Sequence, residues 1–293
     1  MDKIFRAYYV WPKFPSISMS GTACSLSCKH CNHTYLHDMK ELTTPQQLQD
    51  ACDLFVKQEA VGFLLSGGCD KNGKMLNLSR LLPTIKKIKK ETDLIIKLHT
   101  GFVDKNLAED IVSAGIDIAS VEIAGSDQSI QEIFDFNATI ESYTNTLTSL
   151  ESAGMPYIVP HVCIGLHYGE LKGEFHALDI IKNTCDPSVI VFIVFRPTKG
   201  TPMQNCAIPT PDSISRVITY AKSLFPNKDL SLGCIRPRST LRNDIEQAAL
   251  QAGVTRMEIP SKNTLATAKL MGYRIKKISA CCALPEELEQ KIA

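Results

Sequence analysis

Three cysteines within eight positions are the chemically most informative feature of this sequence. Cys24, Cys28 and Cys31 lie in the stretch GTACSLSCKHCNH with the spacing C-x3-C-x2-C. Thiolates at this spacing suit a [4Fe–4S] cube, in which three cysteines bind three irons and the fourth iron can bind a small chelating molecule. The alternative is a zinc site completed by His30 or His33, although no second pair of cysteines has the spacing that zinc commonly uses.

The composition of the 293-residue chain argues against several classes of protein. The net charge is +1 and the basic residues are spread along the sequence, so neither a nucleic-acid nor a membrane-surface protein is indicated. No signal peptide is predicted, and no uncharged apolar run approaches the roughly 18 residues of a membrane span. Eleven cysteines, an odd number, are more typical of metal binding and buried thiols in a reducing compartment than of disulfides. We therefore expect a cytoplasmic protein.

Short apolar runs alternate with amphipathic segments along the chain, which is the pattern of repeated βαβ units. The first strand leads directly into the cysteine loop, and the capping box Thr44-Pro45-Gln46-Gln47 starts the helix that follows. Eight strands are predicted, at 16–21, 62–68, 94–101, 118–125, 157–165, 189–197, 230–234 and 255–260. The later helices are predicted near 79–91, 104–114, 139–153, 173–184, 210–224, 239–252 and 263–272.

Eight buried parallel strands joined by helices predict an α/β fold, a (β/α)8 barrel of the TIM type. An incomplete (β/α)6 barrel with a C-terminal extension is the alternative. We expect a single domain over residues 1–293, with the barrel at about 16–272 and a cysteine-bearing tail at 273–293. Most polar and glycine-rich positions fall at the carboxyl ends of the strands, which share one face of a parallel barrel, and that face carries the chemistry.

The cysteine loop, placed directly after the first strand of an α/β barrel, resembles that of the radical S-adenosylmethionine superfamily. The resemblance implies that the free iron of the cube binds the amino and carboxylate groups of S-adenosylmethionine. It further implies that an electron from the cluster breaks the sulfonium bond, and that the resulting 5′-deoxyadenosyl radical removes hydrogen from a substrate.

Other stretches at the strand ends resemble the cofactor-binding features of that superfamily. The glycines of SGG (66–68) are similar to a glycine pair whose backbone meets the methionine amino group, an approach that glycine permits. The turn RPTKGTP (196–202) resembles the turn beneath the adenine, and the acidic residue after the fourth strand is implied to hold ribose hydroxyls. Cys69 stands where the superfamily often has an acidic residue, so no role is carried over to it. The implied cofactor-binding residues are Gly67, Gly68, Glu122, Gly200, Thr201 and Pro202.

Nearly the whole chain resembles one group in the superfamily, the two-component lipoyl synthases of archaea and anaerobic bacteria. The most specific stretches are PHVCIGLHYGELKGE (160–174) and LGCIRPR (232–238). The resemblance implies sulfur insertion at unactivated C–H bonds of a protein-bound octanoyl chain, which requires radical chemistry. The implied partners are a second synthase subunit, an octanoylated carrier protein or peptide, and a ferredoxin-like reductant. The alternatives are biotin-synthase-like sulfur insertion, the chemistry of a mutase or maturase, and a non-enzymatic zinc or scaffold protein.

In the related synthases the inserted sulfur comes from a second, auxiliary iron–sulfur cluster. The candidate ligands and catalytic residues here are Cys234, at the end of the seventh strand, and Cys281 and Cys282, on a tail that could fold over the same rim. Cys69 is one candidate for a fourth ligand. Oxygen- or nitrogen-bearing candidates nearby in the sequence are Ser239, Arg236 and Arg238. The alternative is a buried core residue at Cys234 and a simply packed tail.

The sequence allows two interpretations of His99 and His161. His99 and His161 could line the barrel interior and touch substrate or cofactor, or they could be hydrogen-bonded core residues. Cys163 is two positions from His161 and shares its face of the strand, and it is expected to belong to the core.

Overall fold

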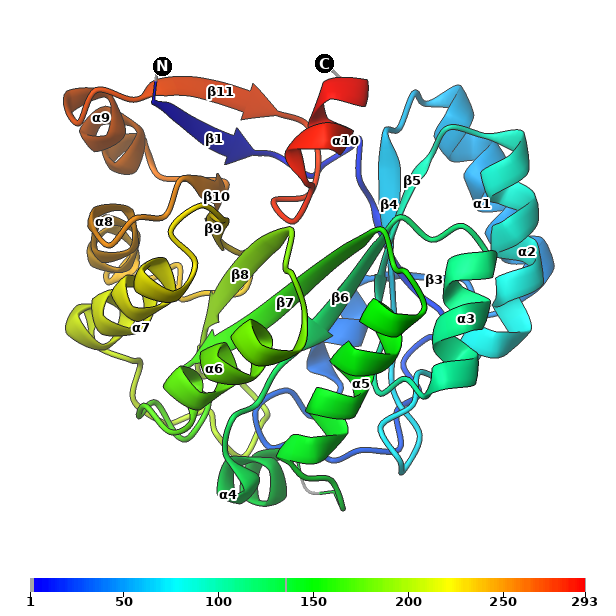
Figure 1. Ribbon diagram of the computed structural model, residues 1–293, viewed down its shortest axis with the longest axis horizontal. Helices are drawn as coiled ribbons and strands as arrows, with labels where there is room; N and C mark the ends of the chain where they lie inside the picture. The colour runs from blue at the N-terminus through cyan, green and yellow to red at the C-terminus, as the bar shows by residue number, and fades with distance from the viewer. Residues whose placement is uncertain (1–2, 135, 293) are drawn as a thin grey trace.

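The computed structural model describes residues 3–134 and 136–292, and its strands form one parallel sheet surrounded by helices (Figure 1). The strands are Ile4–Tyr8 (β1), Ser16–Ser18 (β2), Lys40–Glu41 (β3), Gly62–Ser66 (β4), Ile95–His99 (β5), Ile118–Glu122 (β6), Tyr157–Ile164 (β7), Val189–Val194 (β8), Asp229–Leu232 (β9), Arg256–Glu258 (β10) and Arg274–Ile278 (β11). The helices are Thr34–Asp38 (η1), Pro45–Lys57 (α1), Leu78–Glu91 (α2), Lys105–Ser113 (α3), Asp127–Ser129 (α4), Ile130–Phe134 (η2), Ile140–Ser152 (α5), Glu174–Thr184 (α6), Pro211–Leu224 (α7), Arg242–Gln251 (α8), Lys262–Leu270 (α9) and Glu286–Lys291 (α10).

The predicted α/β barrel is confirmed, and in the described residues it is a partial one. The sheet has the order β11-β1-β10-β9-β8-β7-β6-β5-β4-β2-β3, so the eight predicted strands all occur and are neighbours in sequence order from β2 to β10. The strand β1, which was not predicted, pairs with β10 and occupies the place that β2 would need to close the ring. The sheet is therefore open between its edges at β3 and β11.

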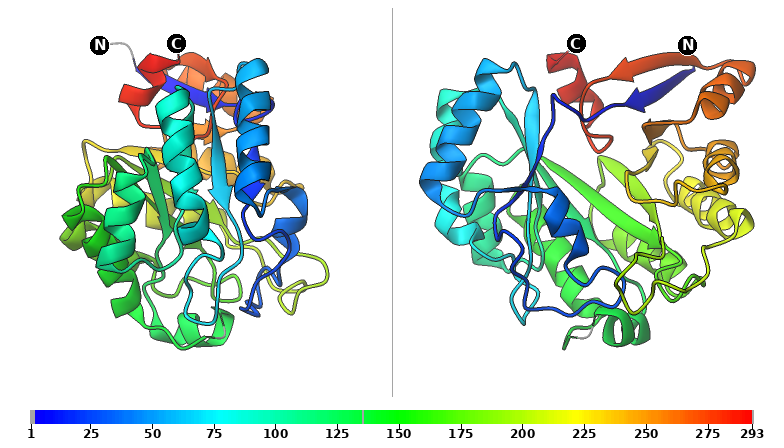
Figure 2. Two further views of the ribbon diagram at one scale, coloured as in Figure 1. Left: turned by 90° about the vertical axis from the view of Figure 1, so that its right-hand side faces the viewer. Right: turned by 180° about the vertical axis from the view of Figure 1, so that it is seen from behind.

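The segment expected to be a tail adds a strand to the sheet. Arg274–Ile278 pairs in parallel with β1, from Ile4 opposite Arg274 to Tyr8 opposite Ile278. The chain then turns back and ends in the short helix α10. Figures 1 and 2 show this red segment inside the space that the sheet curves around, and not among the outer helices.

The alternation of side chains along each strand separates an outer core from the barrel interior. On β5, Ile96 and Leu98 pack with the helices in the outer core, whereas Ile95 faces inward with Lys97 and His99. The inward apolar residues cluster with Leu284 and Leu288 of the C-terminal segment. The interior is thus filled from one end by residues that follow β11.

The helices begin where local sequence signals predict them. In α1, the side chain of Thr44 accepts a hydrogen bond from the backbone of Gln47, and the side chain of Gln47 caps Thr44 in return, which is the predicted capping box. Over residues 3–134 and 136–292, no helix combines the length and apolar character needed to cross a membrane.

Candidate functional site

The cysteine loop follows β2 at the carboxyl end of the barrel and is fixed from two sides. On one side, the backbone N–H of Cys69 donates to Cys24 Sγ at 3.3 Å, and that of Ser25 donates to the Cys69 carbonyl at 2.7 Å. On the other side, Cys28 Sγ donates to the Phe134 carbonyl at 3.6 Å. The loop is therefore held between the segment after β4 and the π-helical turn η2.

All three thiols of the loop line one cavity of about 240 Å³. Cys28 is buried, and Cys24 and Cys31 are half-buried. Glu122 from the end of β6 lines the same cavity, as do Gly67 and the glycine after it. Much of the remaining wall is apolar or aromatic and includes Met75, Phe102, Phe134, Phe136 and Tyr143. The structure thus brings together the predicted cluster ligands, the glycine pair and the predicted ribose-binding carboxylate.

The thiols of this cavity are electrostatically linked. The interaction with the neighbouring Cys28 thiol, together with His30, lowers the pKa of Cys31 to about 4, and the pKa of Cys28 rises well above its ordinary range. Burial acts to lower the pKa of His30, but the charges of Cys31 and Glu122 raise it overall. Burial raises the pKa of Glu122, and Cys31 adds to the effect. Cys31 is consequently a thiolate near neutral pH, the form of cysteine that binds metal.

Gly68 approaches the cysteine loop more closely than any residue with a side chain could. A Cβ at Gly68 would lie 2.1 Å from the Ala23 carbonyl oxygen and 2.4 Å from Cys24 Cβ. A Cβ at Gly67 would meet Ser20 Oγ at 3.1 Å, a milder conflict. The backbone N–H of Gly68 also donates to Ser20 Oγ at 2.7 Å. The glycine pair therefore lets the main chain after β4 pack directly against the loop that carries the thiols.

The donor set and its surroundings fit a [4Fe–4S] cube with S-adenosylmethionine. Three thiols face one cavity, and His30 Nδ1 in its wall has no hydrogen-bond partner among the described residues. Within the same residues, no three His, Cys, Asp or Glu side chains converge as closely as the ligands of a single metal ion do. A cube binds each thiolate through a different iron, so its ligands stand farther apart.

The turn that was expected beneath the adenine lies beside the cysteine loop and not in the cavity. Arg196 stacks over the ring of Tyr35 at 5.0 Å, and Thr198 Oγ1 hydrogen-bonds to Tyr35 Oη at 2.8 Å. None of Gly200, Thr201 and Pro202 is among the described residues that line the cavity. The turn follows β8, where the short motif predicted it. The loop after β8 leaves these three residues outside the cavity that the thiols line.

The second set of cysteines lies inside the barrel, and the expectation that the tail folds over the rim is wrong. Cys282 is buried among Ile95, Ile118 and Val189, the first residues of β5, β6 and β8. The tail therefore enters from the amino end of the strands, opposite to the rim that carries the first cysteine loop. The reason is the strand β11, which runs parallel to β1 and directs the following residues into the open end of the barrel.

The three thiols of this second set influence one another. The contact between the neighbouring thiols and the charge of Lys97 lower the pKa of Cys281 to about 5, against the effect of burial, and the pKa of Cys282 rises. Cys234 is exposed at the protein surface. Desolvation of its thiol raises its pKa, and the charges of Glu258 and Cys281 act in the same direction. Cys234 is thus near enough to Cys281 for their charges to interact, and a shared ligand role for these cysteines and Cys282 stays a prediction. Cys69 is elsewhere, in the wall of the first cavity.

The arginines considered as further ligands are engaged in ion pairs. Arg236 is fully buried and donates to Glu246 Oε1 at 2.8 Å and to the Gly233 carbonyl at 2.6 Å. Arg238 donates to Glu258, which also accepts from Arg236 at 3.5 Å. These contacts fix the segment after β9, and they favour a structural role for both guanidiniums over ligation.

The barrel interior between the two cysteine sets is polar. The rings of His99 and His161 lie 5.0 Å apart. Burial together with the charge of Lys97 lowers the pKa of His99 to about 3, and the same causes hold the pKa of His161 well below its ordinary value. Both imidazoles are therefore neutral near pH 7. Ser120 Oγ and Ser231 Oγ are buried in the same interior and have no hydrogen-bond partner among the described residues. His161 is buried and hydrogen-bonds through Nδ1 to the Val159 carbonyl at 3.0 Å, as a hydrogen-bonded core histidine would, whereas His99 lines the first cavity. Contact of either histidine with substrate or cofactor stays a prediction.

Sequence reasoning missed two residues that matter to these sites. Lys97 was not singled out, although its spacing two positions before His99 places both on one face of a strand. Tyr143, which lines the first cavity, belongs to α5 and carries no local signal. Its place depends on how α5 packs against the sheet.

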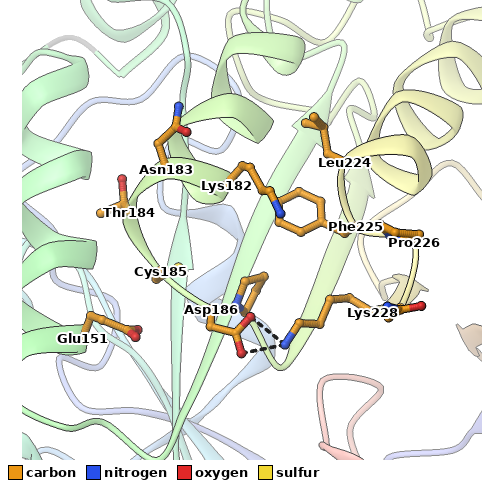
Figure 3. Close-up of a pocket in the computed structure, with 12 residues that line it drawn as sticks. Glu151, Lys182, Asn183, Thr184, Cys185, Asp186, Leu224, Phe225, Pro226 and Lys228 are labelled. Atoms are coloured by element: carbon orange, nitrogen blue, oxygen red, sulfur yellow. Dashed lines mark hydrogen bonds and ion pairs between the residues drawn. The ribbon is translucent and has the colours of Figure 1, made fainter.

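A larger hollow of about 520 Å³ lies at the other end of the barrel wall, between the ends of α6 and α7 (Figure 3). Its most prominent contact is an ion pair between Lys228 and Asp186, with an Nζ–Oδ1 distance of 2.7 Å. Cys185 is its only cysteine among the described residues. None of the predicted site residues lines it.

No family model matches the chain. A search of known proteins does find relatives. The biotin synthase of Campylobacter hominis is 24% identical over 245 residues, which cover 81% of this chain and 72% of that protein. The biotin synthase of Photobacterium profundum is 22% identical over 270 residues, which cover 86% and 74% respectively.

Solved structures share the fold at low sequence identity. Methylornithine synthase matches with a TM-score of 0.63 and 14% identity over 94% of this chain and 84% of that one. HydG, a maturase of the [FeFe]-hydrogenase, matches with a TM-score of 0.68 and 12% identity over 94% and 64%. At such identities these structures establish the fold alone. The similarity to biotin synthases supports the radical S-adenosylmethionine superfamily for this chain. The lipoyl synthase branch is not tested by these comparisons.

Proposed function

We propose that this protein inserts sulfur at unactivated C–H bonds of a protein-bound octanoyl chain, as one subunit of a two-component lipoyl synthase. The observation that carries the proposal is the pair of cysteine sites that face one barrel interior from its two ends. Sulfur insertion needs a site that generates a radical and a site that supplies sulfur, both within reach of one substrate carbon. Rearrangement or maturation chemistry needs only the first.

At the first site, the thiols of Cys24, Cys28 and Cys31 would hold the cube. The main chain of Gly68 would meet S-adenosylmethionine, and the carboxylate of Glu122 would accept hydrogen bonds from its hydroxyls. The aromatic wall of the cavity would exclude water from the reacting carbon. When bound, the first cluster with S-adenosylmethionine supplies a carbon radical that removes hydrogen from an alkyl carbon, and a second cluster supplies sulfide.

At the second site, Cys234, Cys281 and Cys282 would hold the auxiliary cluster. The neutral imidazoles of His99 and His161 lie in the interior that separates the two sites. The proposal includes a second synthase subunit, an octanoylated carrier and a ferredoxin-like reductant.

The test is an anaerobic reaction of the reconstituted protein with an octanoyl-carrier peptide, S-adenosylmethionine and dithionite. Mass spectrometry of the peptide is expected to show a gain of sulfur, with and without a candidate partner subunit. Protein that cleaves S-adenosylmethionine yet never adds sulfur to the peptide, with any partner, would contradict the proposal.

The similarity to biotin synthases favours one alternative, sulfur insertion into a free small substrate. Dethiobiotin replaces the octanoyl peptide in a parallel reaction. Sulfur in the free substrate and none in the peptide would establish this alternative and overturn the lipoyl assignment.

A further inference from the structure

A buried lysine stands at the second cysteine site. Lys97 lies in the middle of β5 with only 3% of its surface exposed, and its strand position directs it into the barrel together with Ile95 and His99. Its ammonium nitrogen lies 3.5 Å from Cys281 Sγ. A lysine side chain so fully enclosed is rare unless a partner compensates its charge.

The positive charge of Lys97 is balanced differently from the charges of the buried arginines. Arg236 pairs with two glutamates, and Arg256 pairs with Asp229 at 2.6 Å and with Glu289 at 2.7 Å. Over the described residues, Lys97 forms no ion pair with a carboxylate, and its hydrogen-bond partner is sulfur. An ammonium that is removed from water without a counter-charge costs several kcal/mol, so negative charge is needed at this position.

The groups that surround this ammonium leave sulfur as the source of that charge. Within the described residues, the group in hydrogen-bond contact with the ammonium is Cys281 Sγ at 3.5 Å, and Cys282 is the next residue along the chain. These cysteines come from the C-terminal segment, whereas the lysine comes from β5. Two parts of the chain therefore meet at one positive charge in the barrel interior.

We infer that Lys97 is a positioning residue of the second site, whose ammonium holds the sulfur-rich group bound by Cys234, Cys281 and Cys282 through its charge and an N–H···S hydrogen bond. This inference rests on the proposed function, because it requires the second cluster. A cluster held by thiolates carries negative charge, and its reduction potential responds to nearby charges and to hydrogen bonds at its sulfurs. Lys97 would therefore both retain the cluster and raise its potential.

The experiment compares Lys97→Met, Lys97→Arg and a control, Lys89→Met. Lys89 is a partly buried lysine that pairs with Asp117 at 2.8 Å, away from either cysteine set. Each protein is reconstituted anaerobically, and iron, sulfide and the midpoint potentials of both clusters are measured. We expect Lys97→Met to lose the iron of the second cluster, or to retain it at a lower potential, while about four irons of the first cube remain. Lys97→Arg and the control are expected to keep both clusters.

A second measurement is made on the wild-type protein, so it does not depend on whether Lys97→Met folds correctly. Wild-type protein with 15N-labelled lysine is expected to show a weak 15N coupling to the reduced second cluster in pulsed EPR, and Lys97→Arg with the same label is expected to lose it.

The outcomes separate the two proposals. Wild-type protein with the iron of one cube alone would remove the second site and this inference with it. Two clusters in the wild type, with no 15N coupling and an unchanged potential in Lys97→Met, would overturn the role of Lys97 and leave the proposed function intact.

Discussion

The two cysteine sites of this protein are built in opposite ways. The first takes Cys24, Cys28 and Cys31 from one loop, and hydrogen bonds to the segment after β4 and to η2 hold that loop in place. The second joins Cys234 to Cys281 and Cys282, which are 47 and 48 positions further along the chain. A local site depends on one loop, whereas a distributed site depends on the elements that bring its parts together.

Buried ion pairs are what bring the distributed site together. Glu289 of α10 is 1% exposed and accepts from Arg256 at 2.7 Å and from Arg6 at 3.1 Å. Tyr8 donates to the same carboxylate. Because Arg6 and Tyr8 belong to β1 and Arg256 to β10, this network fixes the C-terminal segment inside the barrel. The second site should therefore be lost on its own when the network is broken.

The largest effect is expected from removing each set of thiols separately. Replacing Cys24, Cys28 and Cys31 with alanine should remove about four irons and abolish cleavage of S-adenosylmethionine, because the cube loses its ligands. Replacing Cys234, Cys281 and Cys282 should preserve cleavage and abolish sulfur insertion. Iron analysis and chromatography of the cleavage product measure both. Full iron and full sulfur insertion in the second triple variant would refute the auxiliary site.

Breaking the anchor of the C-terminal segment should affect the second site and spare the first. Glu289→Ala leaves Arg6 and Arg256 buried with less compensation, which should cost about 3–5 kcal/mol of unfolding free energy. Urea unfolding and iron analysis provide the measurement. Glu287→Ala, an exposed position on the same helix, is the matched control and should change stability by less than about 0.5 kcal/mol. Loss of the first cluster from an otherwise folded Glu289→Ala protein would contradict the independence of the two sites.

A smaller and local effect is expected at the glycine pair. Gly68→Ala forces its Cβ into Ala23 and Cys24, so it should weaken S-adenosylmethionine binding and cost about 1–3 kcal/mol of stability. Gly67→Ala meets its nearest atom at 3.1 Å and should have a milder effect. Equilibrium binding of S-adenosylmethionine to the reconstituted proteins tests this order. Equal binding by Gly68→Ala and wild type would show that the close approach does not matter.

The smallest expected effect is a pH dependence of stability at the segment that carries Cys234. Burial acts to raise the pKa of Glu246, but Arg236 and further hydrogen bonds lower it to about 2. A carboxyl group with a lowered folded-state pKa stabilises the fold fully above its unfolded value of about 4.3 and loses that contribution as the pH falls toward about 2. Urea unfolding of cluster-free protein from pH 6 to pH 3 should show stability falling with pH.

Glu246→Gln is the comparison for this pH series, because its amide cannot be protonated in the range. Its stability should be lower than that of the wild type at pH 6 and should fall less steeply as the pH decreases. Parallel curves for the two proteins would mean that Glu246 does not contribute to the acid response.

Periodicity predicted the fold because strands and helices are local patterns. The eight strands and the helices between them occur where apolar runs and capping residues placed them, as the capping box of Thr44 and Gln47 illustrates. Three strands escaped prediction. The strand β1 is one of these, because Arg6 and Tyr8 face inward toward charges that the sequence places far away. Their polarity conceals the usual apolar pattern of a buried strand.

The sequence alone determined the first site, because its three thiolates are so close in the chain that one loop after one strand must present them together. The sequence also predicted that this site includes Gly67, Gly68 and Glu122, because the carboxyl ends of parallel strands meet at one rim. Only the tertiary structure decided where Cys281 and Cys282 lie, that Lys97 meets them, and that Gly200 stays outside the cavity. Those outcomes depend on how β11 pairs and on buried charges that are distant in sequence, and no local pattern encodes such pairings.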